Sequence, residues 1–337
     1  MPPPTKSPGE SPHGREGNEG NEGTEGDASA AGGTQIATTG RTGTSSRRST
    51  PVVALWAARL LWLVVAAAGG AGFGDALSDR SRAVQLTGTV LLWVGWATVA
   101  AMLALPGVIG LTLSRTVVPA GTVVAVAATV ARGLDTSTAV TLTTTALATL
   151  VVASGEFGEA MVQASAYGHE RRFLLTPPAA FYVPTAVSWM VLVAAAATGP
   201  LLLAARNWVV GVPVTAIAAV LVWFLPTRFH RLSRRWLVVV PAGVVIHDHV
   251  VLGETVMLRD GTVRRIRLAL ADTQAADLTG PAGGHAIEIT VAEPVGVVFA
   301  GTRQQPNGRA IHARGVLVAP TRPGRVLAAA AARLPVG

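Results

Sequence analysis

The amino-acid sequence predicts an α-helical membrane bundle of about six transmembrane helices, followed by a small cytoplasmic β-rich domain that ends in one α-helix. Six runs of about twenty apolar residues lie between Pro51 and Pro226, and a helix of that length crosses a hydrocarbon core of roughly 30 Å. Only 14% of the residues are charged, whereas a typical soluble domain has about 25%. After Pro226 the long apolar runs give way to short alternating ones, which are typical of strands. The predicted domains are residues 1–50, 51–226 and 227–337.

Residues 1–50 have almost no large apolar side chains and contain consecutive Xaa-Glu-Gly triplets. Such a segment cannot bury enough apolar surface to offset the entropy lost on ordering, so we expect a disordered tail. A secretory signal peptide would need an apolar stretch near the N-terminus, and the first fifty residues contain none. The first span is therefore expected to act as the insertion signal.

The six spans are expected at residues 52–71, 86–105, 111–131, 138–155, 181–203 and 208–225. The third is the weakest, because Arg115 and Pro119 fall in its first turns. An arginine at the bilayer centre costs about 2.5–3.5 kcal/mol, but near a helix end its side chain can reach the headgroups. Arg115 and Arg59 both lie where this is feasible. The alternative for the third span is a re-entrant segment that does not cross.

The arginines predict the orientation, because cytoplasmic loops carry an excess of basic residues. Eleven arginines near the membrane fall on one predicted side and four on the other, namely Arg80, Arg82, Arg132 and Arg206. The protein is therefore expected in the cell membrane, and an even number of crossings places both of its termini in the cytoplasm. A third span that does not cross would separate the termini.

The C-terminal region is expected to form strands at residues 236–240 and 243–246, at 255–259 and 262–270, and at 287–291, 297–300 and 316–319. The Asp260-Gly261 pair predicts a two-residue hairpin turn between the third and fourth of these strands. A helix over residues 322–334, with Pro323 in its first turn and Thr321 as a candidate cap, closes the chain.

The first candidate site is a juxtamembrane basic segment. Its members are Arg228, Arg231, Arg234 and Arg235, next to Trp236. Their spacing gathers the arginines along one helical face, and each basic group near an anionic leaflet contributes about 1 kcal/mol of attraction. The segment therefore predicts binding to anionic lipid headgroups. The alternative is an ordinary stop-transfer flank.

The second candidate site is the polar connection of residues 155–178. It carries Glu156, Glu159, His169, Glu170, Arg171 and Arg172. Glu156 and Glu159 are one helical turn apart, so an extended fourth helix would present both on one face. The alternative is a solvated loop in which Glu170 balances Arg171 and Arg172. No pair of carboxylates, histidine-acid pair or serine motif has a spacing that identifies a reaction.

Four threonines, Thr138, Thr141, Thr145 and Thr149, form a stripe along the fourth span. Hydroxyl and small residues permit close helix packing in lipid, so we expect packing rather than a pore lining. No Asp, Glu, Lys or His lies in the middle of a span, which disfavours an ion-coupled transporter.

His247 and His249 flank Asp248. On a strand, residues two apart point to the same side, so both imidazoles could bind one zinc ion, with His285 or His312 as a third ligand. Surface histidines beside a turn explain the same pattern, and we expect no metal and no cofactor. The chain has no cysteine, which excludes disulfides and a cysteine nucleophile.

Three segments carry a resemblance to a known family: residues 111–119 (LTLSRTVVP), 166–178 (AYGHERRFLLTPP) and 234–248 (RRWLVVVPAGVVIHD). They resemble uncharacterised multi-pass membrane proteins of high-GC actinobacteria, and this resemblance implies no activity. The order of strands ending in a helix also resembles bacterial pleckstrin-homology-like modules that follow membrane helices.

The leading hypothesis for function is a non-enzymatic membrane scaffold or regulatory protein. Residues 226–337 hold fourteen arginines against seven acidic residues, which suits binding of a lipid headgroup or a protein partner at the inner leaflet; no nucleic-acid partner is expected. The alternative is a transporter or channel component that uses the threonine-lined helix. An enzyme acting through Glu156, Glu159 and His169 is the third hypothesis.

Overall fold

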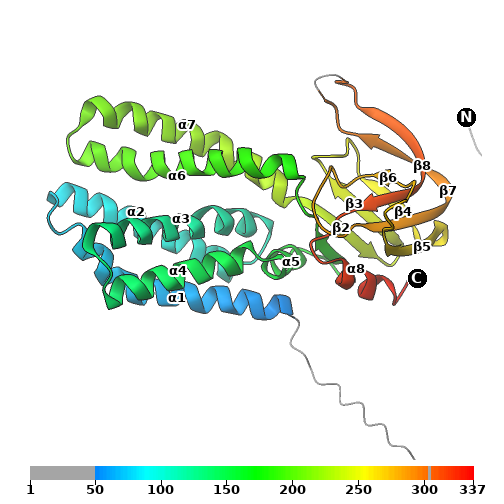
Figure 1. Ribbon diagram of the computed structural model, residues 1–337, viewed down its shortest axis with the longest axis horizontal. Coiled ribbons are helices and arrows are strands. Elements are labelled where there is room, and N and C mark those ends of the chain that lie inside the picture. Colours follow the sequence, from blue (N-terminus) through cyan, green and yellow to red (C-terminus); the bar gives the residue numbers. More distant parts are fainter. Residues whose placement is uncertain (1–49, 303–304) are drawn as a thin grey trace, which may run out of the picture. The chain divides into compact units, whose positions relative to one another are not determined.

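The computed structural model describes residues 50–302 and 305–337, and the predicted disordered tail lies outside this range apart from Thr50. The described residues contain six helices that are long and apolar enough to cross a membrane, which confirms the predicted spans. Figure 1 shows them as one bundle. Their bounds are α1 (Thr50–Ala76), α2 (Arg82–Ala104), α3 (Val108–Arg132), α4 (Thr136–Ala153), α6 (Tyr182–Ala204) and α7 (Trp208–Ser233).

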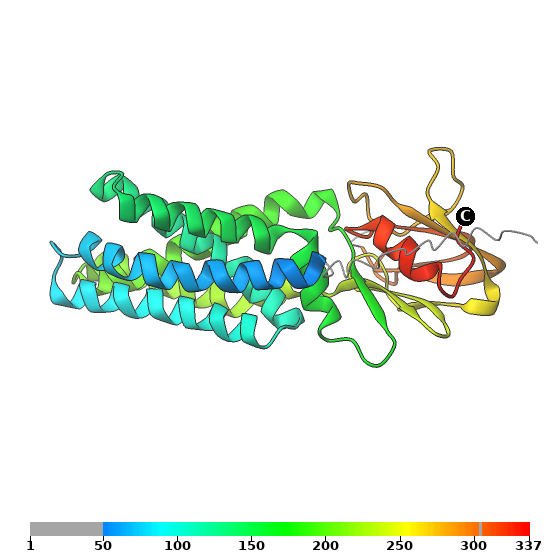
Figure 2. The same ribbon diagram turned by 90° about the horizontal axis from the view of Figure 1, so that it is seen from below.

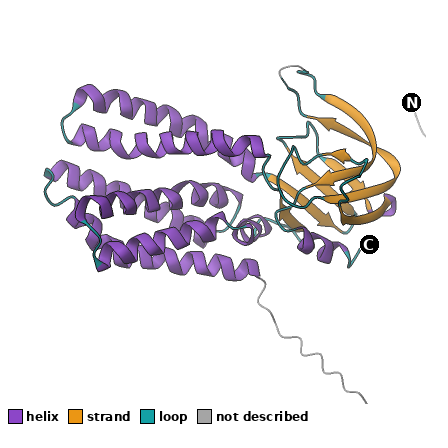
Figure 3. Cartoon of the chain, in the orientation of Figure 1, coloured by secondary structure: helices purple, strands orange, loops and turns teal. Residues whose placement is uncertain are grey.

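The β-rich region contains two four-stranded sheets (Figure 3). The first sheet has the order β1-β2-β3-β4, with β1 (Arg171–Leu174), β2 (Arg235–Val240), β3 (Gly243–Asp248) and β4 (Val256–Arg259). The second has the order β5-β7-β8-β6, with β5 (Val263–Leu268), β7 (Ile287–Phe299), β8 (Arg309–Val318) and β6 (Ala276–Asp277). All pairings are antiparallel except β6 with β8.

Two predictions about the strands are wrong. The strands flanking Asp260-Gly261 do not form a hairpin, because β4 pairs with β3 in one sheet and β5 pairs with β7 in the other. A short 3₁₀ turn, η2 (Asp260–Thr262), joins them, and Gly261 is not among the described residues with positive φ. Residues 297–300 are not a separate strand, since β7 continues through a register shift between Thr290 and Val295.

Strand β1 comes from the connection between the fourth and fifth predicted spans, which sequence reasoning treated as a loop. A short helix, α5 (Gly155–Gln163), precedes it, and β1 pairs with β2 along its whole length. Phe173 and Leu175 pack into the core of the β-rich domain, whereas Leu174 packs into the cluster of the bundle with residues of α5. Because successive strand side chains point to opposite faces, β1 contributes to both cores.

The chain ends in helix α8 (Pro323–Ala330), which confirms the predicted terminal helix with proline at its first position. Arg322 occupies the N-cap and makes no side-chain capping bond, so the expected Thr321 cap is absent there. The Thr321 amide instead donates to the Leu174 carbonyl. Figure 2 shows α8, in red, against the strands of the β-rich region.

Candidate functional site

Two ion pairs join α5 of the bundle to the α8 region of the β-rich domain. Glu156 pairs with Arg322, and Glu159 pairs with Arg325 at 3.0 Å. The two carboxylates are three residues apart on α5 and the two guanidinium groups are three residues apart at the start of α8, so the spacings match. The Glu156 and Glu159 side chains therefore hold the two parts of the chain together.

Glu159 is the more buried of these carboxylates, with 5% of the residue exposed. Its second carboxylate oxygen has no hydrogen-bond partner among the described residues. Burial raises the pKa of Glu159 above the ordinary carboxyl value, and the nearby Arg325 and Arg322 charges oppose this rise. The junction thus contains an acidic group whose charged form is poorly solvated.

The other predicted residues of the polar connection lie in or beside β1. Glu170 accepts two hydrogen bonds from Arg172, the shorter at 2.9 Å, and this confirms that it balances one of the two arginines. Arg171 is exposed at the start of β1, and the carbonyl of the exposed His169 accepts a bond from Arg333. The segment folds against both parts of the chain, so the interpretation as a solvated loop is wrong.

Arg235 is buried and does not lie with the other juxtamembrane arginines. Its Nε and Nη2 atoms donate to Asp248 at 2.8 and 2.7 Å, and its Nη1 atom donates to the Thr176 carbonyl at 2.8 Å. Arg235 is 1% exposed and Asp248 is 2% exposed. We therefore correct the expectation that Arg235 binds lipid, because all of its guanidinium nitrogens are already engaged inside the domain.

The remaining arginines of the basic segment are accessible. Arg228 and Arg231 lie on the last turns of α7, and Arg234 follows the end of that helix; all three are exposed. Trp236 is half-buried on β2, where it packs against the core of the bundle. The structure therefore separates three exposed arginines from Arg235 and Trp236, which serve packing.

Trp236 stacks on one residue of the candidate histidine cluster, and that residue contacts a second one. Its ring lies 5.0 Å from that of His247, which in turn meets His249 edge to face at 4.2 Å. Burial, together with the nearby His249 and Arg234, lowers the pKa of His247. His285 and His312 are exposed on other segments, and no group of three potential ligands is positioned for a metal ion within residues 50–302 and 305–337.

The two arginines inside predicted spans bond to the main chain of neighbouring helix ends. Arg59 donates twice to the Leu103 carbonyl at the end of α2, at 2.9 and 2.8 Å. Arg115 donates to the Val152 and Ser154 carbonyls at the end of α4, both at 3.1 Å. The last carbonyls of a helix have no partner within it, and a positive charge there also interacts favourably with the helix dipole.

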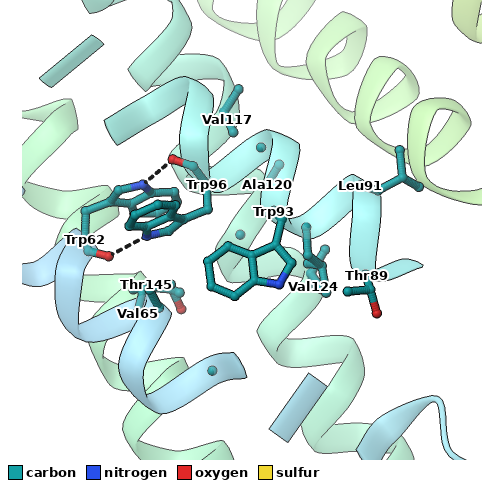
Figure 4. Close-up of a pocket in the computed structure, with 15 residues that line it drawn as sticks. Trp62, Val65, Thr89, Leu91, Trp93, Trp96, Val117, Ala120, Val124 and Thr145 are labelled. Atoms are coloured by element: carbon teal, nitrogen blue, oxygen red, sulfur yellow. Dashed lines mark hydrogen bonds between the residues drawn. The ribbon is translucent and has the colours of Figure 1, made fainter. Parts of the chain in front are cut away.

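A pocket of about 190 Å³ lies between α1, α2 and α3, with Thr145 of α4 at its wall (Figure 4). Two tryptophans form one side of it. The indole N–H of Trp62 donates to the Trp96 carbonyl at 3.0 Å, and that of Trp96 donates to the Trp62 carbonyl at 2.9 Å. This reciprocal pair fixes both rings and satisfies both N–H groups inside the bundle.

The threonine stripe of α4 takes part in helix packing. Thr138, Thr141 and Thr145 are buried, and the Thr149 hydroxyl lies 2.9 Å from that of Thr122 on α3. The Thr145 hydroxyl donates to the Thr141 carbonyl of its own helix. This geometry agrees with the expected packing role.

Sequence reasoning missed the partners of the predicted residues. Arg322 and Arg325 have the same three-residue spacing as Glu156 and Glu159, and this match in the sequence could have indicated the two ion pairs. Asp248 was considered only as part of a histidine cluster. The tryptophan pair and its pocket carry no local motif, because they depend on how three helices pack.

Comparisons of the chain with protein-family models, curated proteins and solved structures gave no match. The fold itself defines the class: this is a multi-pass membrane protein with a C-terminal β-rich region that closes on a single helix.

Proposed function

We propose that the chain is a non-enzymatic membrane scaffold or regulatory protein that binds an anionic lipid headgroup at the inner leaflet, through the exposed arginines between the end of α7 and the β-rich domain. The observation that carries this proposal is the double attachment of the domain to the bundle. Pairing of β1 with β2 and the two ion pairs between α5 and the α8 region fix the domain beside the end of α7. The exposed arginines of α7 are then held at one position relative to the membrane.

The charge supports an anionic ligand. Arg228, Arg231 and Arg234 are exposed at the α7 end and have no acidic partner among the described ion pairs. At about 1 kcal/mol for each basic group, three arginines contribute roughly 3 kcal/mol, or about a hundredfold in affinity. A protein partner at the same surface is the outcome to consider if lipid binding fails.

The test uses the full chain in nanodiscs that contain equal amounts of phosphatidylcholine and phosphatidylglycerol. Native mass spectrometry measures the ratio of the two lipids that stay bound. We expect enrichment of phosphatidylglycerol, and its loss when Arg228, Arg231 and Arg234 are all changed to glutamine.

A matched control changes three exposed arginines at the other ends of the spans, Arg80, Arg82 and Arg206, to glutamine. This control removes the same charge and should keep most of the enrichment. Equal enrichment in the wild type and in both triple variants would remove lipid binding from the proposal.

The proposed orientation places the β-rich domain in the cytoplasm. Since the sequence has no cysteine, single cysteines can report on each side. Asp79→Cys, in the turn after α1, should react with an impermeant thiol reagent on intact cells, whereas Asn307→Cys, before β8, should not. Reaction at position 307 from outside would overturn the inner-leaflet role.

The resemblance to uncharacterised actinobacterial membrane proteins and to pleckstrin-homology-like modules also stays a proposal. Its support is the three quoted segments and the order of strands before the closing helix.

A further inference from the structure

The pocket between α1, α2 and α3 lies near the middle of three membrane-spanning helices. Trp62, Trp96 and Gly121 lie about halfway along α1, α2 and α3 respectively. No water is available at this depth of a bilayer, so an apolar opening there faces hydrocarbon. Among the lining residues, Thr89 and Trp93 are exposed and lie one turn apart on α2, so they mark the side that opens laterally.

The inner walls of the pocket are mostly carbon, and the Thr89 hydroxyl and the Trp93 indole N–H are polar groups on its exposed side. The indole N–H groups of Trp62 and Trp96 are engaged by main-chain carbonyls, and the Thr145 hydroxyl donates within its own helix. An occupant therefore needs no polar group to satisfy these three inner side chains. Apolar cavities of about 150 Å³ stay dry and take up apolar molecules, and this pocket is slightly larger at about 190 Å³.

The glycines that line the pocket are the second, independent observation. Gly199 and Gly211 are forced by close packing, because an added Cβ would lie about 3.0 Å from neighbouring main-chain atoms, and at Gly110 it would lie 3.1 Å from the Met102 carbonyl oxygen. At Gly95 and Gly121 the nearest atom to such a Cβ is 3.7 Å away, which is ordinary contact. Alanine would fit at both positions, and glycine costs about 1 kcal/mol relative to alanine inside a helix.

Both of these unforced glycines line the pocket. Glycine at these positions keeps open a volume that the neighbouring helices do not need for their own packing. We propose that the pocket binds one acyl chain of a membrane phospholipid, which enters from the bilayer on the side of Thr89 and Trp93. This site is separate from the arginines of α7, and either site can exist without the other.

The test uses the full chain in phosphatidylcholine nanodiscs that contain a phosphatidylcholine with a diazirine in the middle of one acyl chain. After irradiation, mass spectrometry compares labelling of α2 and α3 peptides with labelling of the lipid-exposed α7 peptide around Val220. At low probe content we expect about tenfold more label at the pocket, the ratio that corresponds to 1.4 kcal/mol of preference. Pocket labelling should saturate as the probe fraction rises, whereas α7 labelling should rise in proportion.

Gly121→Leu fills the pocket and should reduce its labelling to the level seen at α7. Ala219→Leu adds the same side chain to an exposed position of α7 and serves as the matched control, in which pocket labelling should persist. Should Gly121→Leu fail to fold, saturation in the wild type decides the question alone. Labelling that rises linearly at the pocket, or that is displaced by a polyprenyl phosphate and not by unlabelled phosphatidylcholine, would overturn the assignment.

Discussion

Breaking the buried pair between Arg235 and Asp248 tests whether Arg235 is a structural residue or a lipid ligand. The change Arg235→Met keeps most of the side-chain volume but removes the donors to both Asp248 oxygens and to the Thr176 carbonyl. Asp248 would keep only the amide bonds from Val250 and Val251. Removing one partner of a buried ion pair typically costs about 3–5 kcal/mol, because the other charge is left uncompensated.

Hydrogen exchange of the full chain in nanodiscs measures this loss locally. The amides of β2 and β3 should exchange about 10² to 4 × 10³ times faster in Arg235→Met than in the wild type, since each 1.4 kcal/mol corresponds to a factor of ten. Arg234→Met is the matched control, because the adjacent residue is exposed and an exposed substitution usually changes stability by less than about 0.5 kcal/mol.

The double variant Arg235→Met with Asp248→Leu replaces the whole pair with apolar groups and should recover most of the protection. The structural role is refuted if Arg235→Met and Arg234→Met exchange alike. A loss of anionic-lipid enrichment in Arg235→Met with unchanged protection of β2 and β3 would restore the original expectation for this arginine.

Three further predictions concern single residues. Because burial raises the pKa of Glu159, this carboxyl holds its proton more tightly in the folded protein than in the unfolded chain. The wild type should therefore lose thermal stability relative to Glu159→Gln as the pH rises above roughly 4.3, the ordinary pKa of a glutamate. A stability difference that does not depend on pH would contradict this. Arg115→Met leaves carbonyls at the end of α4 without their donor and should lower the free energy of unfolding in detergent by about 1–3 kcal/mol, while Arg80→Met should change it little. Thr145→Leu overpacks a buried position and should cost about 1–3 kcal/mol; a loss of solute flux in liposomes at unchanged stability would instead favour the transporter alternative.

The sequence predicted the spans because their signal is local. Length and apolarity within one segment decide whether a helix can cross a bilayer, and Arg115 and Pro119 did not prevent α3 from forming a continuous 25-residue helix. The Pro241-Ala242-Gly243 sequence also marks the turn between the strands expected at 236–240 and 243–246, because proline and glycine favour turns. In the structure Gly243 adopts a φ of 135°, and an added Cβ would collide with the Leu258 carbonyl.

The errors have a common cause, which is dependence on contacts far apart in the chain. Residues 171–174 read as a charged loop because their partner strand begins at Arg235, after two intervening spans. From the sequence, Arg235 was interpreted as one more juxtamembrane cation, because its partner Asp248 becomes a neighbour only when β2 pairs with β3. At Asp260-Gly261 the local turn preference was overridden, because the two flanking strands belong to different sheets.

The chain order around β1 explains how the membrane and soluble parts are coupled. Strand β1 precedes α6, with a short 3₁₀ helix (Ala179–Phe181) between them, and β2 follows α7, so pairing of the two strands closes the α6 and α7 hairpin at its base. Phe173 on β1 belongs to the core of the β-rich domain and Leu174 to that of the bundle. A displacement of α6 and α7 relative to α5 would therefore disturb β1 from both sides, and with it the ion pairs that hold α5 against the α8 region. Because packed cores shift between discrete arrangements rather than deform gradually, such a junction would transmit a movement of the membrane helices to the β-rich region, as the proposed regulatory function requires.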